Sequence, residues 1–252
     1  MPRRASWLIG LVCAASLWAA APAMATVLPV GQWDLNEGAG LVAHNDSPLS
    51  GSGALSGAVS WTSGRFAGGL AFAGTSGEVD VANSPALDAA DVTVSAWVQS
   101  SGSPGDYRYI AVKGGNGCCT GSYGLYTGAA GGLEFYVASS ATTYVVSPDA
   151  GTGVWDGRWH NVIGTFDGST VRLYVDGKQV GSGTPDSAPI QYGLPTSNDF
   201  VIGNYPWCPG LGFAGDIDEV KVFDRALSPT EIGLAYLVSN LLPNYSPIDL
   251  IL

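Results

Sequence analysis

Apolar and polar side chains alternate along short segments of this chain. In Val92–Gln99, small apolar side chains occupy every second position, and Thr93, Ser95, Trp97 and Gln99 lie between them. A period of two is typical of a β-strand, because successive side chains of a strand point to opposite faces of a sheet. Similar segments recur along the chain between clusters of Gly, Ser, Pro, Asn and Asp. The pattern predicts an all-β protein.

Two Asp-Gly pairs stand between the most regular of these segments. The pairs at 167–168 and 176–177 separate three segments that we expect to be strands, at residues 159–166, 171–175 and 178–180. Asp-Gly is typical of tight hairpin turns, because Gly accepts a positive φ and Asp tolerates it. Two such turns so close together predict an antiparallel meander.

Further short strands are expected at residues 30–34, 59–62, 69–73, 78–81, 107–113, 123–127, 132–137, 142–146, 200–202 and 217–223. One helix is expected near the C-terminus, because Ser228 and Glu231 form a capping box with Pro229 at the first helical position. We expect this helix to end near Leu237. Residues 239–252 contain two prolines and are expected to form a tail.

Residues 1–25 have the features of a secretory signal peptide. Two arginines precede an apolar run, and Ala-Met-Ala at 23–25 fits a cleavage site. The apolar run is too short to cross a membrane comfortably. We therefore expect a secreted, soluble protein with one globular domain over residues 26–238.

The charge balance disfavours two classes of partner. The chain carries 10 basic and 21 acidic side chains, a formal net charge of −11, and removal of the leader would remove two of the arginines. Nucleic acids and anionic membranes are both bound through basic patches. We therefore expect neither nucleic-acid binding nor membrane insertion.

Three cysteines follow the leader: Cys118, Cys119 and Cys208. Export favours disulfides, and we expect Cys208 to pair with Cys119, or with Cys118 in its place, so that two long loops are tied together. A bridge between the neighbours Cys118 and Cys119 is the rarer alternative, and zinc binding is a weaker one. An odd number leaves one thiol, either free or linking the chain to a second copy.

The meander carries a motif of a known family. Trp159-His160-Asn161-Val162, then Thr-Phe-Asp-Gly at 165–168 and Leu-Tyr-Val-Asp-Gly at 173–177 resemble the signature of LamG-like jelly-roll domains, in the concanavalin A-like lectin and glucanase group. Six further segments fit that family in order, at residues 31–40, 68–74, 92–99, 109–115, 200–204 and 212–232. The resemblance implies a two-sheet antiparallel jelly-roll sandwich, to which the capping box adds one short C-terminal helix.

The same resemblance implies a structural calcium ion. Family members commonly hold calcium between an N-terminal loop and the Asp of a Gly-x-Ile-Asp-Glu-Val run, which nominates Asp218 and Asp46 as ligands, with Asp34 as weaker support. Calcium accepts six to eight oxygen ligands from carboxylates and loop carbonyls. The alternative is that these carboxylates cap turns or are solvated.

A hydrolase is a minor alternative. Retaining glycosidases need two carboxylates about 5 Å apart, and the related glucanases carry a pattern like Glu-x-Asp-x-x-Glu on one strand. Here Asp216 replaces the first Glu, and Lys221 replaces the last. Strand alternation places Glu219 on the opposite face from Asp218. His160 belongs to the family signature and is interpreted as structural, so we expect a non-catalytic protein.

Loop aromatics and neighbouring polar residues suggest sugar binding, because rigid rings stack on sugars with little loss of entropy. We expect Trp207 and Tyr205 to be stacking platforms near the cysteine loops, and the remaining candidate ligand-binding residues are Asn116, Asp106, Arg108 and Tyr107. The alternative is that Trp207 folds inward as a lid on the core. Trp155 and Tyr192 are further expected loop aromatics, and three tryptophans on family strand positions are assigned to the core: Trp33, Trp97 and Trp159.

These features predict a secreted, non-catalytic carbohydrate-binding module whose partner is a glycan or polysaccharide. The alternative is an extracellular domain that binds protein or assembles into a matrix. The sequence does not name the ligand, because loop chemistry varies freely on such a scaffold.

Overall fold

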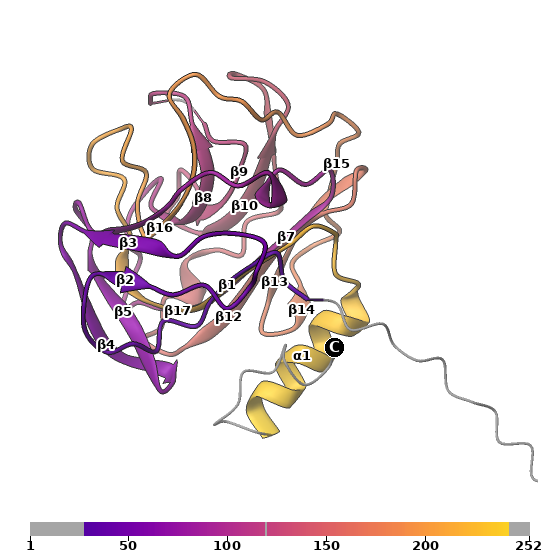
Figure 1. Ribbon diagram of the computed structural model, residues 1–252. Helices are drawn as coiled ribbons and strands as arrows, with labels where there is room; N and C mark the ends of the chain where they lie inside the picture. Colours follow the sequence, from indigo (N-terminus) through magenta and orange to yellow (C-terminus); the bar gives the residue numbers. More distant parts are fainter. Residues whose placement is uncertain (1–27, 119, 242–252) are drawn as a thin grey trace, which may run out of the picture.

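The computed structural model describes residues 28–118 and 120–241. The expected leader, Cys119 and residues 242–252 of the expected tail therefore lie outside the described residues. Two antiparallel sheets pack face to face, and one α-helix lies against the outer face of one of them (Figure 1). This confirms the expected two-sheet jelly-roll sandwich.

The first sheet consists of β1 (Gly31–Trp33), β4 (Val59–Phe66), β5 (Gly68–Ala73), β7 (Val92–Gln99), β12 (His160–Phe166), β13 (Thr170–Val175), β14 (Lys178–Gln179), β15 (Thr184–Pro185) and β17 (Ala214–Phe223). The strand order is β14-β13-β12-β7-β17-β5-β4, with β1 beside β17 and β15 beside β13. The first and last strands of the chain are therefore neighbours.

The second sheet consists of β2 (Val42–Ala43), β3 (Gly53–Ser56), β6 (Glu78–Val81), β8 (Tyr109–Gly115), β9 (Tyr123–Thr127), β10 (Leu133–Ala138), β11 (Tyr144–Val146) and β16 (Ser197–Ile202). The strand order is β11-β10-β9-β8-β16-β6-β3-β2. Two short 3-10 helices, η1 (Pro85–Leu87) and η2 (Thr152–Val154), lie in connections between strands.

The hydrophobic core lies between the two sheets. Every second side chain of β7 belongs to it, as the alternation predicted: Val92, Val94, Ala96 and Val98. Trp33 on β1 is buried in the same core and stacks on Phe200 of β16, with ring centroids 5.2 Å apart. Burial of each large apolar side chain contributes about 1.5–3 kcal/mol, so this alternation drives the packing of the two sheets.

Strands β12, β13 and β14 form the expected meander. At the second turn, Asp176 and Gly177 both have a positive φ, 51° and 74°. The Asp176 carboxylate accepts a hydrogen bond of 3.0 Å from the backbone N–H of Asn161. The Asp167 carboxylate accepts one of 3.0 Å from the N–H of Ser169 at the first turn. The Asp167 side chain therefore stabilises its own turn, whereas the Asp176 side chain ties the second turn to β12.

Strand β17 contains a β-bulge at Glu219, whose φ is 53°. The register with β7 shifts between Asp218 and Lys221. Before the bulge Ile217 faces the core, and after it Val220 does, so the bulge changes which positions face inward. The Glu219 and Lys221 side chains are thereby kept out of the core between the sheets. Outside that core they form an ion pair of 3.0 Å.

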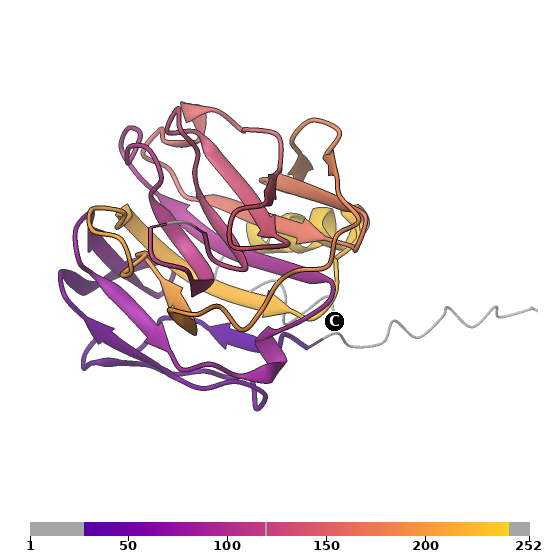
Figure 2. The same cartoon turned by 90° about the horizontal axis from the view of Figure 1, so that it is seen from above.

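The C-terminal helix α1 (Pro229–Leu241) begins with the predicted capping box. The backbone N–H of Glu231 donates to Ser228 Oγ at 3.3 Å, and the N–H of Ser228 donates to Glu231 Oε2 at 2.7 Å. Helix α1 packs on the outer face of the first sheet, against side chains of β12, β13 and β17 (Figure 2). No helix in the described part of the chain is long and apolar enough to span a bilayer.

Helix α1 extends past the predicted end near Leu237 to Leu241. Ser239 is buried, and its carbonyl accepts a hydrogen bond of 3.3 Å from the Arg65 guanidinium. This tertiary contact stabilises a turn that the local sequence does not predict. Residues 239–241, which the sequence assigned to the tail, therefore belong to the helix.

Two of the assigned core tryptophans lie outside the inter-sheet core. Trp97 is buried on the outer face of the first sheet, where it stacks on Tyr236 of α1 with centroids 6.2 Å apart. Trp159 is only partly buried. Conversely, the expected loop aromatic Trp155 is buried in the core, and Tyr192 packs against it. Trp97 is therefore buried as expected, although beneath the helix, and Trp155 and Tyr192 lie in loops as expected, although in loops that pack against the core.

Candidate binding site

A disulfide joins Cys118, after β8, to Cys208, before β17. This is the second of the two predicted pairings, so the pairing with Cys119 that the sequence placed first is wrong. Because a cysteine sulfur forms one disulfide bond, the bond to Cys118 excludes a bond from Cys208 to Cys119. As expected, the bridge ties two long loops together across a sequence separation of 90.

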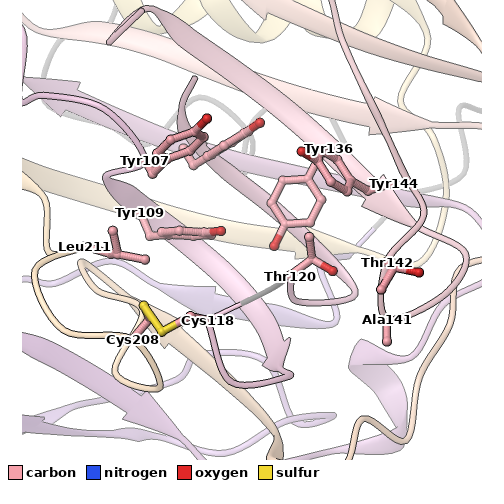
Figure 3. A pocket seen from close by; sticks show the side chains of 11 residues that line it. Tyr107, Tyr109, Cys118, Thr120, Tyr136, Ala141, Thr142, Tyr144, Cys208 and Leu211 are labelled. Carbon is pink, nitrogen blue, oxygen red and sulfur yellow. A yellow bond between two sulfur atoms is a disulfide. The ribbon is translucent and has the colours of Figure 1, made fainter. Parts of the chain in front are cut away.

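Beside this disulfide lies a pocket of about 510 Å³ (Figure 3). Its volume is within the usual range for small-ligand sites. Five tyrosines dominate its lining, which consists of Tyr107, Tyr109, Cys118, Thr120, Tyr126, Tyr136, Ala141, Thr142, Tyr144, Cys208 and Leu211. We call this site the tyrosine pocket.

Three buried tyrosines on the outer face of the second sheet form the base of the pocket. Tyr109 of β8 is paired with Tyr126 of β9, and their ring centroids lie 5.5 Å apart. Tyr136 of β10 meets Tyr126 edge to face at 5.1 Å. Gly124 makes room for this arrangement, because a Cβ there would lie 2.9 Å from the Tyr136 ring. The three rings are therefore fixed by packing on one another.

The buried tyrosines keep their hydroxyl protons. The Tyr136 hydroxyl accepts a hydrogen bond of 2.9 Å from the backbone N–H of Gly121. Burial raises the pKa of Tyr109, Tyr126 and Tyr136 above the usual value for tyrosine. These phenols consequently remain neutral at physiological pH.

The remaining two tyrosines are exposed at the rim of the pocket. Tyr107 is 43% exposed and Tyr144 is 46% exposed. Tyr144 packs edge to face on Tyr136, with centroids 6.1 Å apart. Tyr107 has a φ of 54°, a left-handed conformation that costs energy for a residue other than Gly. The N–H of the next residue, Arg108, donates to Thr127 Oγ1 at 2.7 Å and helps to hold this conformation.

The two expected stacking platforms do not line the tyrosine pocket. Tyr205 is fully buried, stacks on Tyr109 at 4.7 Å, and accepts a hydrogen bond of 3.1 Å from the backbone N–H of Asn116. With no exposed surface and no place in the pocket lining, the Tyr205 ring offers no stacking platform in this structure. Trp207 is partly buried, meets Tyr205 edge to face at 5.0 Å and covers Gly115. This placement resembles the alternative in which Trp207 folds inward as a lid. The ring covers the cluster of tyrosines on the outer face of the second sheet, however, and not the core between the sheets.

The expected polar contacts lie beside the pocket and not in its lining. The Arg108 guanidinium donates a hydrogen bond to the carbonyl of Gly210, and so ties the β8 strand to the loop that carries Cys208. Asp106 is exposed. Of the six predicted ligand-binding residues, Tyr107 alone lines the tyrosine pocket. The structure adds Tyr109, Tyr126, Tyr136 and Tyr144.

The three nominated calcium ligands do not converge. Asp34 lies next to Asp46. Burial raises the pKa of Asp34 most, the positive charge of Lys221 acts to lower it, and the negative charge of Asp46 raises it further. Asp218 is fully buried, and its carboxylate instead accepts a hydrogen bond of 2.9 Å from the N–H of Phe66. Burial raises the pKa of Asp218 to about 8.

The positive charge beside Asp34 comes from a lysine. Lys221 Nζ lies 3.8 Å from Asp34 Oδ1 and 3.0 Å from Glu219 Oε2. Among the described residues, no group of three His, Cys, Asp or Glu side chains could hold a metal ion. Asp34 and Asp46 are thus two neighbouring carboxylates, and the predicted set that includes Asp218 does not form a metal-binding group among the described residues.

Comparison with known proteins supports the fold. The profile of the family described as the concanavalin A-like lectin/glucanases superfamily matches residues 73–233. A comparison with curated proteins finds no match. Domain 4 of AbnA, a GH43 extracellular arabinanase from Geobacillus stearothermophilus, was solved in complex with arabinotriose. It is similar over 83% of this chain and 98% of that domain, with a TM-score of 0.61 and 15% identity.

Two further solved structures are similar over part of their length. Trypanosoma rangeli sialidase, in complex with 2,3-difluorosialic acid, gives a TM-score of 0.63 and 18% identity over 87% of this chain and 34% of that one. The botulinum neurotoxin serotype G binding domain gives a TM-score of 0.62 and 11% identity over 84% of this chain and 51% of that one. The chain thus spans about a third of the sialidase and half of the neurotoxin domain. At these identities the likeness concerns the fold alone.

Proposed function

We propose that this chain, which belongs to the concanavalin A-like lectin/glucanases superfamily, binds carbohydrate without cleaving it. The observation that carries the proposal is the tyrosine pocket, in which two exposed rings stand over a base of three buried ones. The ligand is a glycan or polysaccharide, and Tyr107 and Tyr144 make the first contacts with it.

The chemistry of the pocket suits a sugar. Sugar rings present C–H groups that pack on aromatic faces, and hydroxyls that need hydrogen-bond partners. A tyrosine offers both, because it combines an apolar body with a polar tip. Thr120 and Thr142 add further hydroxyls to the lining. Because the three base rings are already packed on one another, little side-chain entropy is lost on binding.

The absence of cleavage is part of the proposal. Most glycosidases use a pair of carboxyl groups that flank the scissile bond, and the lining residues of the tyrosine pocket carry no carboxyl group. Asp218, the carboxylate nearest to the glucanase pattern in sequence, is buried on the other sheet. The similar arabinanase domain, solved with arabinotriose, adds support from the same fold.

Two further expectations belong to the proposal. The protein is secreted, with residues 1–25 as its signal peptide. It carries a structural calcium ion at Asp34 and Asp46, without Asp218, because Lys221 is shared between Asp34 and Glu219 and does not neutralise both neighbouring carboxylates.

The proposal is tested with an array of immobilised glycans and the mature chain. Tyr144→Ala and Tyr107→Ala should each weaken the binding of a glycan by at least about tenfold, because alanine scans of central aromatic contacts commonly give such losses. Leu49→Ala, at an exposed position on the β2–β3 connection, serves as the control and should bind normally. Binding that survives both tyrosine variants would place the site elsewhere.

A second candidate is protein binding. Three leucines on one side of α1 are exposed, Leu234, Leu237 and Leu241, and they recur at the spacing of a helical stripe. The binding domain of a related neurotoxin, botulinum neurotoxin DC, was solved in complex with rat synaptotagmin II and has a similar fold. A glycan array without any specific signal would favour this candidate over the first.

A further inference from the structure

We infer that the tyrosine pocket is selective for uncharged sugars and excludes acidic ones, such as uronic and sialic acids. This inference rests on the proposed carbohydrate binding and specifies its ligand class. It depends on the charges in and around the pocket.

The described residues of the lining carry no charge. All eleven lining residues are Tyr, Thr, Ala, Leu or Cys, and both cysteines are joined in the disulfide, so neither can ionise. Burial keeps the three base phenols neutral by raising their pKa. A carboxylate that entered the pocket would therefore leave water without meeting a positive partner, which is costly.

The basic side chain nearest in sequence to the rim is directed elsewhere. Arg108 follows the rim residue Tyr107, but its guanidinium donates to the carbonyl of Gly210 and lies against Gly105. Lys113, on the same strand, has its Nζ 2.8 Å from Asp88 and 2.8 Å from Asn83 Oδ1, and is fully buried. Neither side chain lines the pocket.

The charge close to the pocket is negative. Glu134 on β10 hydrogen-bonds to Tyr126, one of the base rings. Asp106 precedes the rim residue Tyr107 and is exposed. The whole chain carries a formal charge of −11. Like charges across an interface suppress the wrong partner, so both desolvation and repulsion act against an acidic sugar.

The test compares neutral ligands with acidic counterparts: the triuronates differ from their parents only at C6, and 3′-sialyllactose adds one sialic acid to lactose. Cellotriose and β-1,4-mannotriose are compared with their C6-oxidised triuronates, and lactose with 3′-sialyllactose, by calorimetry or by competition on the array. Each acidic member should bind at least about tenfold more weakly than its neutral partner. The difference should decrease as salt is raised, because salt screens repulsion at the rim.

A gain-of-function variant strengthens the test. Thr142 is exposed and lines the pocket, so Thr142→Lys places an ammonium at the rim, and Thr142→Gln is the uncharged control of similar size. Thr142→Lys should reduce the difference in affinity between the neutral and the acidic ligand of each pair, and Thr142→Gln should leave this difference unchanged.

The outcomes separate the inference from the function on which it rests. Acidic members that bind as tightly as neutral ones, and lose binding in Tyr144→Ala, would overturn the selectivity while leaving carbohydrate binding intact. If no member of any pair binds, and the array gives no other ligand that depends on Tyr144, both the proposed function and the inference are wrong.

Discussion

The five tyrosines of the pocket divide into two roles at the scale of single residues. Tyr109, Tyr126 and Tyr136 are buried and hold one another, whereas Tyr107 and Tyr144 are about half exposed and contact solvent. Under the proposed function, packing and recognition are carried by different residues, and substitutions should separate the two.

Tyr136→Ala should lower the free energy of unfolding by about 3–5 kcal/mol, as for other large aromatic side chains in a core. Tyr144→Ala, at a 46% exposed position, should lower it by less than about 1 kcal/mol and yet weaken sugar binding. Urea unfolding of both variants measures the difference. A Tyr144→Ala variant that unfolds as easily as Tyr136→Ala would show that the rim ring is structural.

His160 gives the meander a dependence on pH. Its Nδ1 lies 2.7 Å from Asp176 Oδ2, and its Nε2 lies 3.1 Å from Asp156 Oδ1. Burial acts to lower the pKa of His160, but the hydrogen bonds and charges of Asp176 and Asp156 raise it above the usual 6.5. Both ring nitrogens therefore have partners, which supports the structural role that the sequence suggested.

A histidine whose folded pKa is raised stabilises the folded state fully below its unfolded pKa, near 6.5, and this contribution is lost as the pH rises through the folded pKa. The stability difference between the native protein and His160→Gln should therefore be larger at pH 6 than at pH 9. Urea unfolding at several pH values measures it. A difference that is constant over this range would mean that the pKa of His160 is the same in the folded and unfolded states.

The outward-facing tyrosines were within reach of sequence reasoning. Phe135 and Val137 belong to the core, so alternation on β10 directs Tyr136 outward. The expected platforms Tyr205 and Trp207, by contrast, do not line the pocket, and the sequence could not have shown this. Their loop is folded onto the outer face of the sheet, where Tyr205 stacks on Tyr109, and a sequence gives no measure of how closely a loop packs.

At the scale of elements, the structure follows local sequence where an element carries its own signal. Strands β6, β7 and β9 have the predicted bounds. Strands β2, β3 and β15 were missed, because they contain only two to four residues and depend on pairing with a neighbour. The bulge at Glu219 was also missed, since nothing in a regular alternation predicts a change of phase.

The capping box allows a test of the helix as an element. Ser228→Ala removes the acceptor of the Glu231 N–H and should lower stability by about 1 kcal/mol, as measured for other N-caps. Thr230→Ala is the control, because Thr230 is exposed and lies two residues after Ser228 in the same helical turn. Equal effects of the two substitutions would contradict the role of the cap.

At the scale of the whole molecule, long-range pairs determine what local patterns leave open. The pairing of β1 with β17 brings Asp34 to Lys221 across almost the whole chain. The predicted calcium site already placed the N-terminal loop beside this run of β17, but it did not include the lysine. Likewise, the sequence restricted the disulfide to two choices, and the fold selected Cys118.

The calcium proposal predicts a global effect. A ligand that binds only the folded state stabilises it, so calcium should raise the melting temperature by several degrees and chelator should reverse this. Asp46→Asn should abolish the response, and Asp218→Asn should retain it, because the Asp218 carboxylate is instead bonded to the N–H of Phe66. An unchanged melt after confirmed removal of metal would remove calcium from the proposal.

The disulfide connects stability to binding, because it closes a long loop and also forms part of the pocket wall. Removing a native disulfide commonly costs about 2–5 kcal/mol, so Cys208→Ser should unfold at lower urea. The variant should also bind sugar more weakly under conditions where it is still folded. Without the disulfide, the loop that carries Leu211 is no longer tied to the loop that follows β8. Cys119→Ser is the matched control, since the bridge does not use Cys119, and it should change neither property. A Cys208→Ser variant that is destabilised but binds normally would show that the bridge supports the fold and not the pocket.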